Sequence, residues 1–250
     1  ADLGFTTVST NPCGEIPLCP YDSCRLLALN LLSYVDNPFT KEAKFNFDLF
    51  KEHIAKAMHL MDDIIDLELE KVNLIISKIE SDPEDQDVRR VELELWKKIK
   101  DMALKGRRTG LGITAEGDML AALGLRYGSE EAIDFAVEVH KTLAVEAYRA
   151  SVMMAKDRGA FGVFNFEKEQ GNPMVGRILE AAPEHRELMQ QYGRRNIAML
   201  TIAPTGTTSL MSQTTSGIEP VFRPVYKRRR KINPSDKDQV ASFVDETGEK

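Results

Sequence analysis

The sequence predicts an α/β protein, because long segments with helical periodicity alternate with short apolar runs that suit buried strands. The longest helical segment covers residues 47–79, where apolar side chains recur at helical spacing. The apolar runs at residues 26–34 and 196–203 have the length and composition of strands. In this fold class, functional residues are expected in the loops that follow the strands.

Local signals predict each element in turn. Residues 1–24 are rich in Thr, Pro, Gly and Cys without a sustained period, which predicts a short strand and a loop. Asn46 or Asp48 suits the N-cap of the helix at 47–79, and Ser129 suits that of a long helix at 130–158. The other expected elements are a helix at 96–105, a glycine-punctuated turn at 107–112, a short helix at 119–123, a helix at 184–192 and a polar turn at 204–209.

Composition and charge argue against several classes of function. The chain has 250 residues and a formal net charge of −6, which argues against direct nucleic-acid binding as its main role. The basic run at 227–231 is interpreted as a solvated surface face. The sequence has neither a signal-peptide pattern nor a membrane-spanning apolar run, so we expect no membrane contact and a cytoplasmic location. His53 and His59 do not share a helical face, and we expect no metal site.

Three cysteines, Cys13, Cys19 and Cys24, lie in one short segment, which is too local for a secreted disulfide framework and points to chemistry. An amide, a thiol and a carboxylate fall within residues 11–15, NPCGE. On an extended strand alternate side chains share a face, so Asn11, Cys13 and Glu15 are expected to point at one ligand. This pattern suits a reacting thiol, a carboxylate that moves a proton and an amide that holds a hydroxyl. A loop cysteine flanked by cap residues explains the same run equally well.

A second candidate site is the hydroxyl-rich segment that follows the apolar run at 196–203. It consists of Pro204, Thr205, Gly206, Thr207, Thr208 and Ser209. Hydroxyls and backbone N–H groups that converge at the start of a helix favour an anion, so this segment is a candidate phosphate loop. It lacks the lysine of a Walker loop, and Thr/Ser-rich turns are also common without a ligand.

Four ordered motifs make the chain resemble the large subunits of ribonucleotide reductases. They are NPCGEIPL at 11–18, a cysteine at position 24 followed by LNL at 29–31, RRTGLG at 107–112, and APTGT at 203–207 followed by SGIEP at 216–220. The resemblance implies part of the ten-stranded α/β barrel of that family, with residues 1–230 as the C-terminal portion of the barrel and 231–250 as a tail of unassigned structure. Pro12 and Gly14 beside the cysteine resemble the adenosylcobalamin-dependent class more than the diiron-dependent class.

The resemblance also implies roles within the radical-cysteine loop, residues 9–24. Cys13 matches the cysteine whose thiyl radical abstracts the ribose 3′ hydrogen, and Glu15 matches the carboxylate that takes the 3′-hydroxyl proton. Asn11 matches the amide that hydrogen-bonds the sugar. Cys24 matches one of two cysteines that form a disulfide as the 2′-hydroxyl leaves as water. Cys19 departs from the pattern and is interpreted as a bystander, with a local Cys19–Cys24 disulfide as the alternative.

The implied activity is that of an oxidoreductase that reduces ribonucleoside di- or triphosphates to 2′-deoxyribonucleotides for DNA synthesis, with residues 204–209 binding the phosphates. The implied cofactor is adenosylcobalamin. The implied partners are the ribonucleotide, a thioredoxin-like dithiol reductant and a second copy in a homodimer.

The family's other redox cysteine and its effector loops lie upstream of the matched segment. We therefore expect the chain to need a polypeptide that carries the upstream half of the barrel. The alternatives are a non-catalytic nucleotide-binding remnant or regulatory module, and a large subunit of the diiron-dependent class. The NPCGE run disfavours the anaerobic glycyl-radical class.

Overall fold

The structure, a computed structural model, describes residues 4–23 and 25–223, together with residues 225, 232, 235 and 240. The chain divides into two units, Ala1–Pro220 and Val221–Lys250, and every helix and strand named below lies in the first. Cys24, the basic run at 227–231 and most of the expected tail at 231–250 lie outside the described residues. The expected boundary between residues 230 and 231 stays a prediction.

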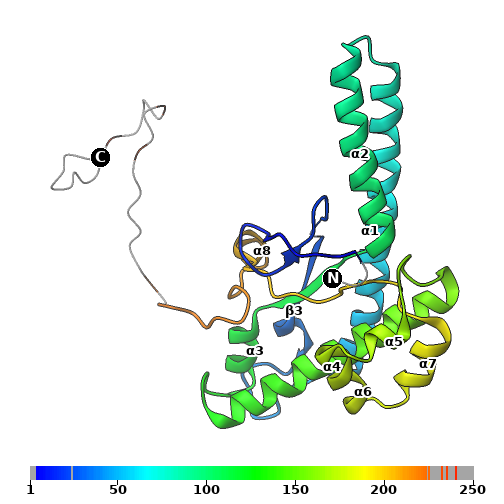
Figure 1. The fold of residues 1–250 in the computed structure, drawn as a ribbon. Coiled ribbons are helices and arrows are strands. Elements are labelled where there is room, and N and C mark those ends of the chain that lie inside the picture. Colours follow the sequence, from blue (N-terminus) through cyan, green and yellow to red (C-terminus); the bar gives the residue numbers. More distant parts are fainter. Residues whose placement is uncertain are drawn as a thin grey trace. The chain divides into compact units, whose positions relative to one another are not determined.

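Helices and strands both occur, as expected for the α/β class (Figure 1). The helices are α1 (Phe47–Ser81), α2 (Gln86–Gly106), α3 (Glu116–Ala122), α4 (Glu130–Arg158), α5 (Phe166–Glu169), α6 (Pro173–Ala181), α7 (His185–Tyr192) and α8 (Gly206–Ser212), with a 3-10 turn, η1, at Leu31–Tyr34. The strands are β1 (Ser9–Thr10), β2 (Pro17–Leu18), β3 (Leu26–Asn30), β4 (Val35–Asp36), β5 (Lys44–Phe45) and β6 (Gly110–Thr114). Among the described residues, no helix is long and apolar enough to span a bilayer.

The centre of the first unit is the parallel pair of β3 and β6, in which Leu26 lies opposite Gly110 and Asn30 opposite Thr114. The segment 196–203 runs along the other side of β6. Leu111 donates its N–H to Met199 O at 2.7 Å and accepts from Thr201 N at 3.0 Å. Three extended segments that are distant in sequence therefore lie side by side.

Two sequence predictions are corrected here. Residues 110–112, expected within a turn, begin the buried strand β6. A Cβ at Gly112 would lie 2.1 Å from Thr201 O. Glycine at this position therefore allows the backbones of two segments to approach closely, and it does not mark a turn. The expected strand at 196–203 forms only an isolated bridge, Leu111 with Leu200.

The long helices follow their predicted caps. The side chain of Asn46 accepts from Leu49 N at the start of α1, and that of Ser129 accepts from Ala132 N at the start of α4. The helix expected at 96–105 begins earlier, at Gln86, because Asp85 caps it by accepting from Asp87 N at 2.8 Å. The strand expected at 26–34 ends at Asn30, whose side chain caps η1.

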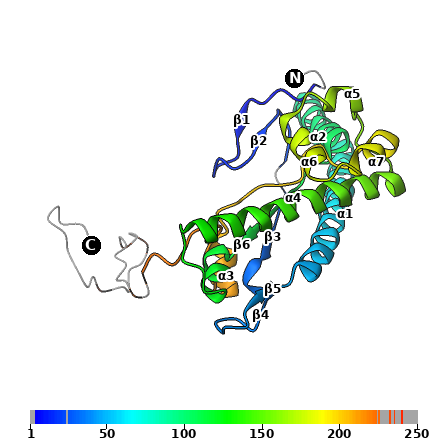
Figure 2. The ribbon, with the colours of Figure 1, turned by 90° about the horizontal axis from the view of Figure 1, so that it is seen from below.

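The helices form a core behind β3 and β6 and a projecting hairpin. Figure 1 shows α1 and α2 side by side, extending away from the remaining helices, and α6 and α7 lie beside α4 in both views (Figure 2). The core includes Phe50, Ile54 and Met58 of α1, Leu111 and Ile113 of β6, and Val139 of α4, all fully buried. This core fixes the strand pair on which the site described below is built.

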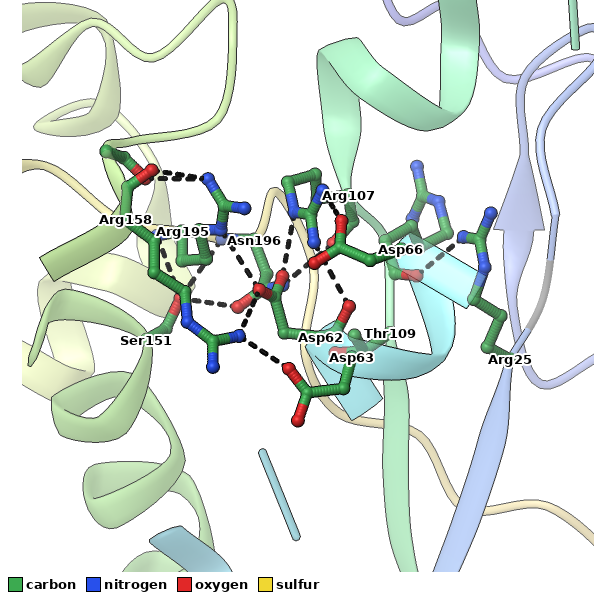
Figure 3. Close-up of polar contacts among 12 residues, drawn as sticks. Arg25, Asp62, Asp63, Asp66, Arg107, Thr109, Ser151, Arg158, Arg195 and Asn196 are labelled. Atoms are coloured by element: carbon green, nitrogen blue, oxygen red, sulfur yellow. Dashed lines mark hydrogen bonds and ion pairs between the residues drawn. The ribbon is translucent and has the colours of Figure 1, made fainter. Parts of the chain in front are cut away.

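A buried polar network joins α1 to the start of β6 (Figure 3). Asp62 of α1 is fully buried, and its carboxylate accepts from Arg107 Nε at 2.8 Å, Arg195 Nε at 3.1 Å and Asn196 Nδ2 at 3.2 Å. Asn196 Oδ1 in turn accepts from Ser151 of α4 at 2.9 Å. The network ties α1, α4, the residues before β6 and the segment 196–203 to one another.

Candidate functional site

A cavity of about 330 Å³ brings the two sequence-predicted loops together. Cys13 and Glu15 line it from the β1–β2 hairpin, and residues 203–208 line it from the other side. Residues of β3 and β6, with Thr201, complete the lining. The thiol, the carboxylate and the hydroxyl-rich loop therefore face one space.

The loop that carries Cys13 is a tight turn between β1 and β2, and the expected extended strand across residues 11–15 is wrong. Asn11 N–H donates to Ile16 O at 3.1 Å and Gly14 N–H donates to Asn11 O at 3.0 Å. Gly14 has a φ of 82°, a conformation that glycine adopts without steric cost. The chain turns because these backbone bonds close a short loop, so alternate side chains do not share a strand face.

Asn11 has a structural part in this turn. Its Oδ1 accepts from Ile16 N at 2.9 Å, and Asn11 is absent from the cavity lining. Its side-chain amide donates no hydrogen bond within the described residues. The structure thus brings Cys13 and Glu15, but not Asn11, to the cavity wall.

Thr201 anchors the cysteine loop, a role that sequence analysis missed. Its hydroxyl donates to Glu15 O at 3.0 Å and so ties the loop to the segment beside β6. Glu15 Oε2 is buried and has no hydrogen-bond partner within the described residues. A buried, unpaired carboxylate oxygen is costly, which makes it a strong acceptor for a donor placed in the cavity.

The two described thiols differ in accessibility. Cys13 is exposed, whereas Cys19 is buried, and both are free. Burial and the nearby charge of Asp22 raise the pKa of the Cys19 thiol. A buried neutral thiol is a poor nucleophile, which agrees with the interpretation of Cys19 as a bystander. No group of three or more His, Cys, Asp or Glu in the described ranges could hold a metal ion.

Arg108 contacts the chain on both sides of position 24. Its Nε donates to Asp22 Oδ2 at 2.7 Å, and its backbone O accepts from Arg25 Nη1 at 2.9 Å. Arg25 also pairs with Glu68 of α1. The motif at 107–112 was recognised in the sequence, but this tether was not, because Asp22 lies 86 residues away from Arg108.

The hydroxyl-rich loop opens α8, as the sequence analysis allowed. Thr205 has a φ of 52° and α8 begins at Gly206. The N–H groups of the first helical residues have no partner inside the helix, and residues 204–208 line the cavity. Ser209 is buried and does not line it.

A thiol-bearing hairpin loop and a hydroxyl-rich loop, set around one cavity that parallel strands also line, define an α/β protein with a site between these loops and its strands. The family model described as "Ribonucleotide reductase, barrel domain" matches residues 5–243. The chain belongs to this ribonucleotide reductase family, and the predicted fold class is confirmed.

Relatives and a solved structure agree with this assignment. The vitamin B12-dependent ribonucleoside-diphosphate reductase of Mycobacterium tuberculosis (strain CDC 1551 / Oshkosh) is 31% identical over 220 residues, which cover 88% of this chain and 25% of the relative. The protein of the same name from Thermoplasma acidophilum is 32% identical over 223 residues, covering 88% and 23%. The ribonucleoside-diphosphate reductase subunit alpha of Chlamydia pneumoniae is 28% identical over 240 residues, covering 87% and 20%.

The class Id ribonucleotide reductase alpha subunit of Actinobacillus ureae matches in fold, with a TM-score of 0.56 and 22% identity over 88% of this chain and 33% of that one. The chain spans about a quarter of the length of the two vitamin B12-dependent relatives.

Proposed function

We propose that this chain supplies the thiyl-radical loop and the phosphate loop of a ribonucleotide reductase that makes 2′-deoxyribonucleotides for DNA synthesis. The observation that carries the proposal is that Cys13 and Glu15 line the same cavity as residues 204–208. The names of the relatives favour a ribonucleoside diphosphate over a triphosphate as substrate.

In this proposal the Cys13 thiyl radical abstracts the ribose 3′ hydrogen, and the unpaired Glu15 oxygen takes the 3′-hydroxyl proton. The 2′-hydroxyl leaves as water, and two thiols supply the two electrons as they become a disulfide. Cys24 is one of these thiols. The two thiols also supply the proton that leaves in the water and the hydrogen that C2′ gains. The 3′ hydrogen then returns from Cys13 to the sugar, and Glu15 returns its proton to the 3′ oxygen. Asn11 lies outside the cavity lining, and it would hold the sugar only if the side-chain N–H groups that the turn leaves unused are turned toward the bound ligand.

The proposed cofactor is adenosylcobalamin, because two relatives that are 31% and 32% identical are named as vitamin B12-dependent. When bound, the cofactor supplies the radical that oxidises the Cys13 thiol. The exposure of Cys13 fits this role, since its thiol is accessible to a group outside the folded core. A thioredoxin-like dithiol would reduce the disulfide after each turnover, and the active form would be a cytoplasmic homodimer.

The test is Cys13→Ser in the full-length enzyme, with Cys19→Ser as a matched control. Serine cannot relay a hydrogen atom, because its O–H bond is much harder to break homolytically than an S–H bond. Cys13→Ser should abolish deoxynucleotide formation and leave nucleotide affinity unchanged, whereas Cys19→Ser should retain most turnover. Deoxynucleotide formation by Cys13→Ser would refute the proposal. Nucleotide binding without turnover in the unmodified enzyme would favour the non-catalytic alternative.

A further inference from the structure

We propose that Thr114 of β6 is a positioning residue for the phosphate loop, acting through the hydroxyl of Thr205, and that Thr207 carries the hydroxyl that donates to phosphate. This inference rests on the proposed function, because it names the groups that hold and complete the loop assigned to the substrate's phosphates.

Counting protons gives one arrangement of the hydrogen bonds behind the loop in which each hydroxyl donates once. Thr114 Oγ1 donates to Thr215 O at 3.2 Å, which uses its single proton. In that arrangement the 2.9 Å contact between the hydroxyls of Thr114 and Thr205 is donated by Thr205, although the geometry alone permits either donor. Thr205 Oγ1 also accepts from Gly217 N at 2.8 Å. In this arrangement both threonine protons are used inside the protein, and the Thr205 hydroxyl has none left for a phosphate.

These hydrogen bonds hold Thr205 in an uncommon backbone conformation. Its φ of 52° lies in the left-handed region, which a β-branched residue rarely adopts. The bonds to Thr114 and Gly217 oppose relaxation of Thr205 to an ordinary conformation. Because α8 begins at the next residue, the conformation of Thr205 decides where the first N–H groups of that helix point.

The other hydroxyls of the loop differ in whether their proton is already used in a hydrogen bond within the protein. Thr208 Oγ1 donates to Thr205 O at 3.1 Å. Ser209 is buried, and its hydroxyl contacts Gly206 O at 3.0 Å and Ser216 Oγ at 2.9 Å. Thr207 lines the cavity, and its hydroxyl makes no hydrogen bond within the described part of the chain. Thr207 therefore keeps a free proton for a ligand.

Thr114 itself is buried and does not line the cavity. Any effect of Thr114 on phosphate affinity must therefore pass through the loop. This separates a positioning role from direct contact with the substrate.

The experiment measures the affinity of the full-length protein for a ribonucleoside diphosphate and for the matching nucleoside, by calorimetry. Thr207→Val tests the phosphate site, and Thr114→Val tests the positioning role. Thr109→Val is the matched control, because Thr109 is also buried on the approach to β6 and its hydroxyl contacts Met199 O at 3.3 Å. Thr114→Ser keeps the hydroxyl and should restore the affinity.

We expect Thr207→Val and Thr114→Val each to weaken diphosphate binding roughly five-fold or more, with nucleoside binding unchanged. Thr109→Val should bind both ligands like the unmodified protein. In a double-mutant cycle, the effects of Thr205→Val and Thr114→Val should be less than additive, because both remove the bond between the two hydroxyls and Thr205→Val removes in addition only the bond from Gly217 N. If Thr114→Val does not fold, Thr114→Ala serves instead, since it adds no methyl group against Thr215 O.

The two proposals fail in different ways. Normal diphosphate affinity in folded Thr114→Val, with a loss in Thr207→Val, would overturn the positioning role and leave the phosphate site standing. Failure of Thr114→Ser to restore affinity would also overturn it. Equal affinity of the unmodified protein for the diphosphate and the nucleoside would overturn the phosphate site itself.

Discussion

Asp62 and Arg107 form a buried ion pair in which Arg107 Nε lies 2.8 Å from Asp62 Oδ1 (Figure 3). The same guanidinium donates from Nη2 to the backbone O of Asp62 at 3.0 Å. Asp62 also accepts from Arg195, so one carboxylate joins α1 to the residues before β6 and before the segment 196–203. β6 and the segment 196–203 both contribute residues to the lining of the candidate site.

Asp62→Ala should therefore destabilise the fold strongly. The substitution leaves Arg107 buried without its main counter-ion, and breaking such a buried pair costs about 3–5 kcal/mol. Denaturant unfolding of the variant measures this loss. Asp63→Ala is the control, because Asp63 is half exposed and, among the described residues, pairs only with Arg158. The free energy of unfolding of this variant should fall by about 0–1 kcal/mol. Equal losses in the two variants would show that the network is not the source of stability.

The same pair predicts a dependence of stability on pH. Burial opposes ionisation of Asp62, but the hydrogen bonds and charges of Arg107 and Arg195 outweigh it and hold the pKa of this carboxyl below its usual value. The folded pKa is below the unfolded one, about 3.9, so the stabilisation is complete above that pH and is lost as the pH falls through the folded pKa. Unfolding free energies measured from about pH 6 to about pH 3 should decline, and less steeply in Asp62→Asn. Identical slopes would contradict this assignment.

Cys24 and Cys19 should have different roles in turnover. Cys24→Ser should fail in dithiol-driven turnover if Cys24 supplies electrons through a disulfide with an upstream cysteine. Cys19 should react slowly with an alkylating reagent compared with Cys13, because Cys19 is buried and its thiol pKa is raised. Mass spectrometry after one turnover checks the pairing. A Cys19–Cys24 disulfide in the peptide map would mean that the wrong thiols have been paired.

Gly112→Ala should disrupt the site by displacing the segment that contains Thr201. The added methyl group would meet Thr201 O at 2.1 Å and push away the segment whose Thr201 hydroxyl anchors Glu15. We expect a loss of about 1–3 kcal/mol in the free energy of unfolding, together with lower turnover. Gly176→Ala in α6 is the matched control, because nothing lies within 4 Å of a Cβ there and alanine favours the helix. Unchanged stability in Gly112→Ala would show that the close approach of the two segments is not needed.

Local sequence signals determined the two longest helices, α1 and α4, with their N-caps, and the family motifs, whereas α5, α6 and the start of α2 were not predicted. Asn46, Ser129 and Gly159 mark helix ends through bonds to residues a few positions away, so these ends can be predicted without the rest of the fold. The motifs around Cys13 and Thr205 were recognisable for a similar reason, since each lies within a continuous stretch of chain.

Only the tertiary structure decided what those residues do with their side chains. Sequence periodicity did not reveal that residues 110–112 begin a strand, because that strand is defined by its neighbours at 26–30 and 199–201. Asp62 meets Asn196 across 134 positions, and Thr205 meets Thr114 across 91. The position of a helix depends on hydrogen bonds between residues that are close in sequence, so local signals predict it. The partner of a buried carboxylate or hydroxyl is whichever group, often distant in sequence, the fold brings within about 3 Å, so only the tertiary structure shows it.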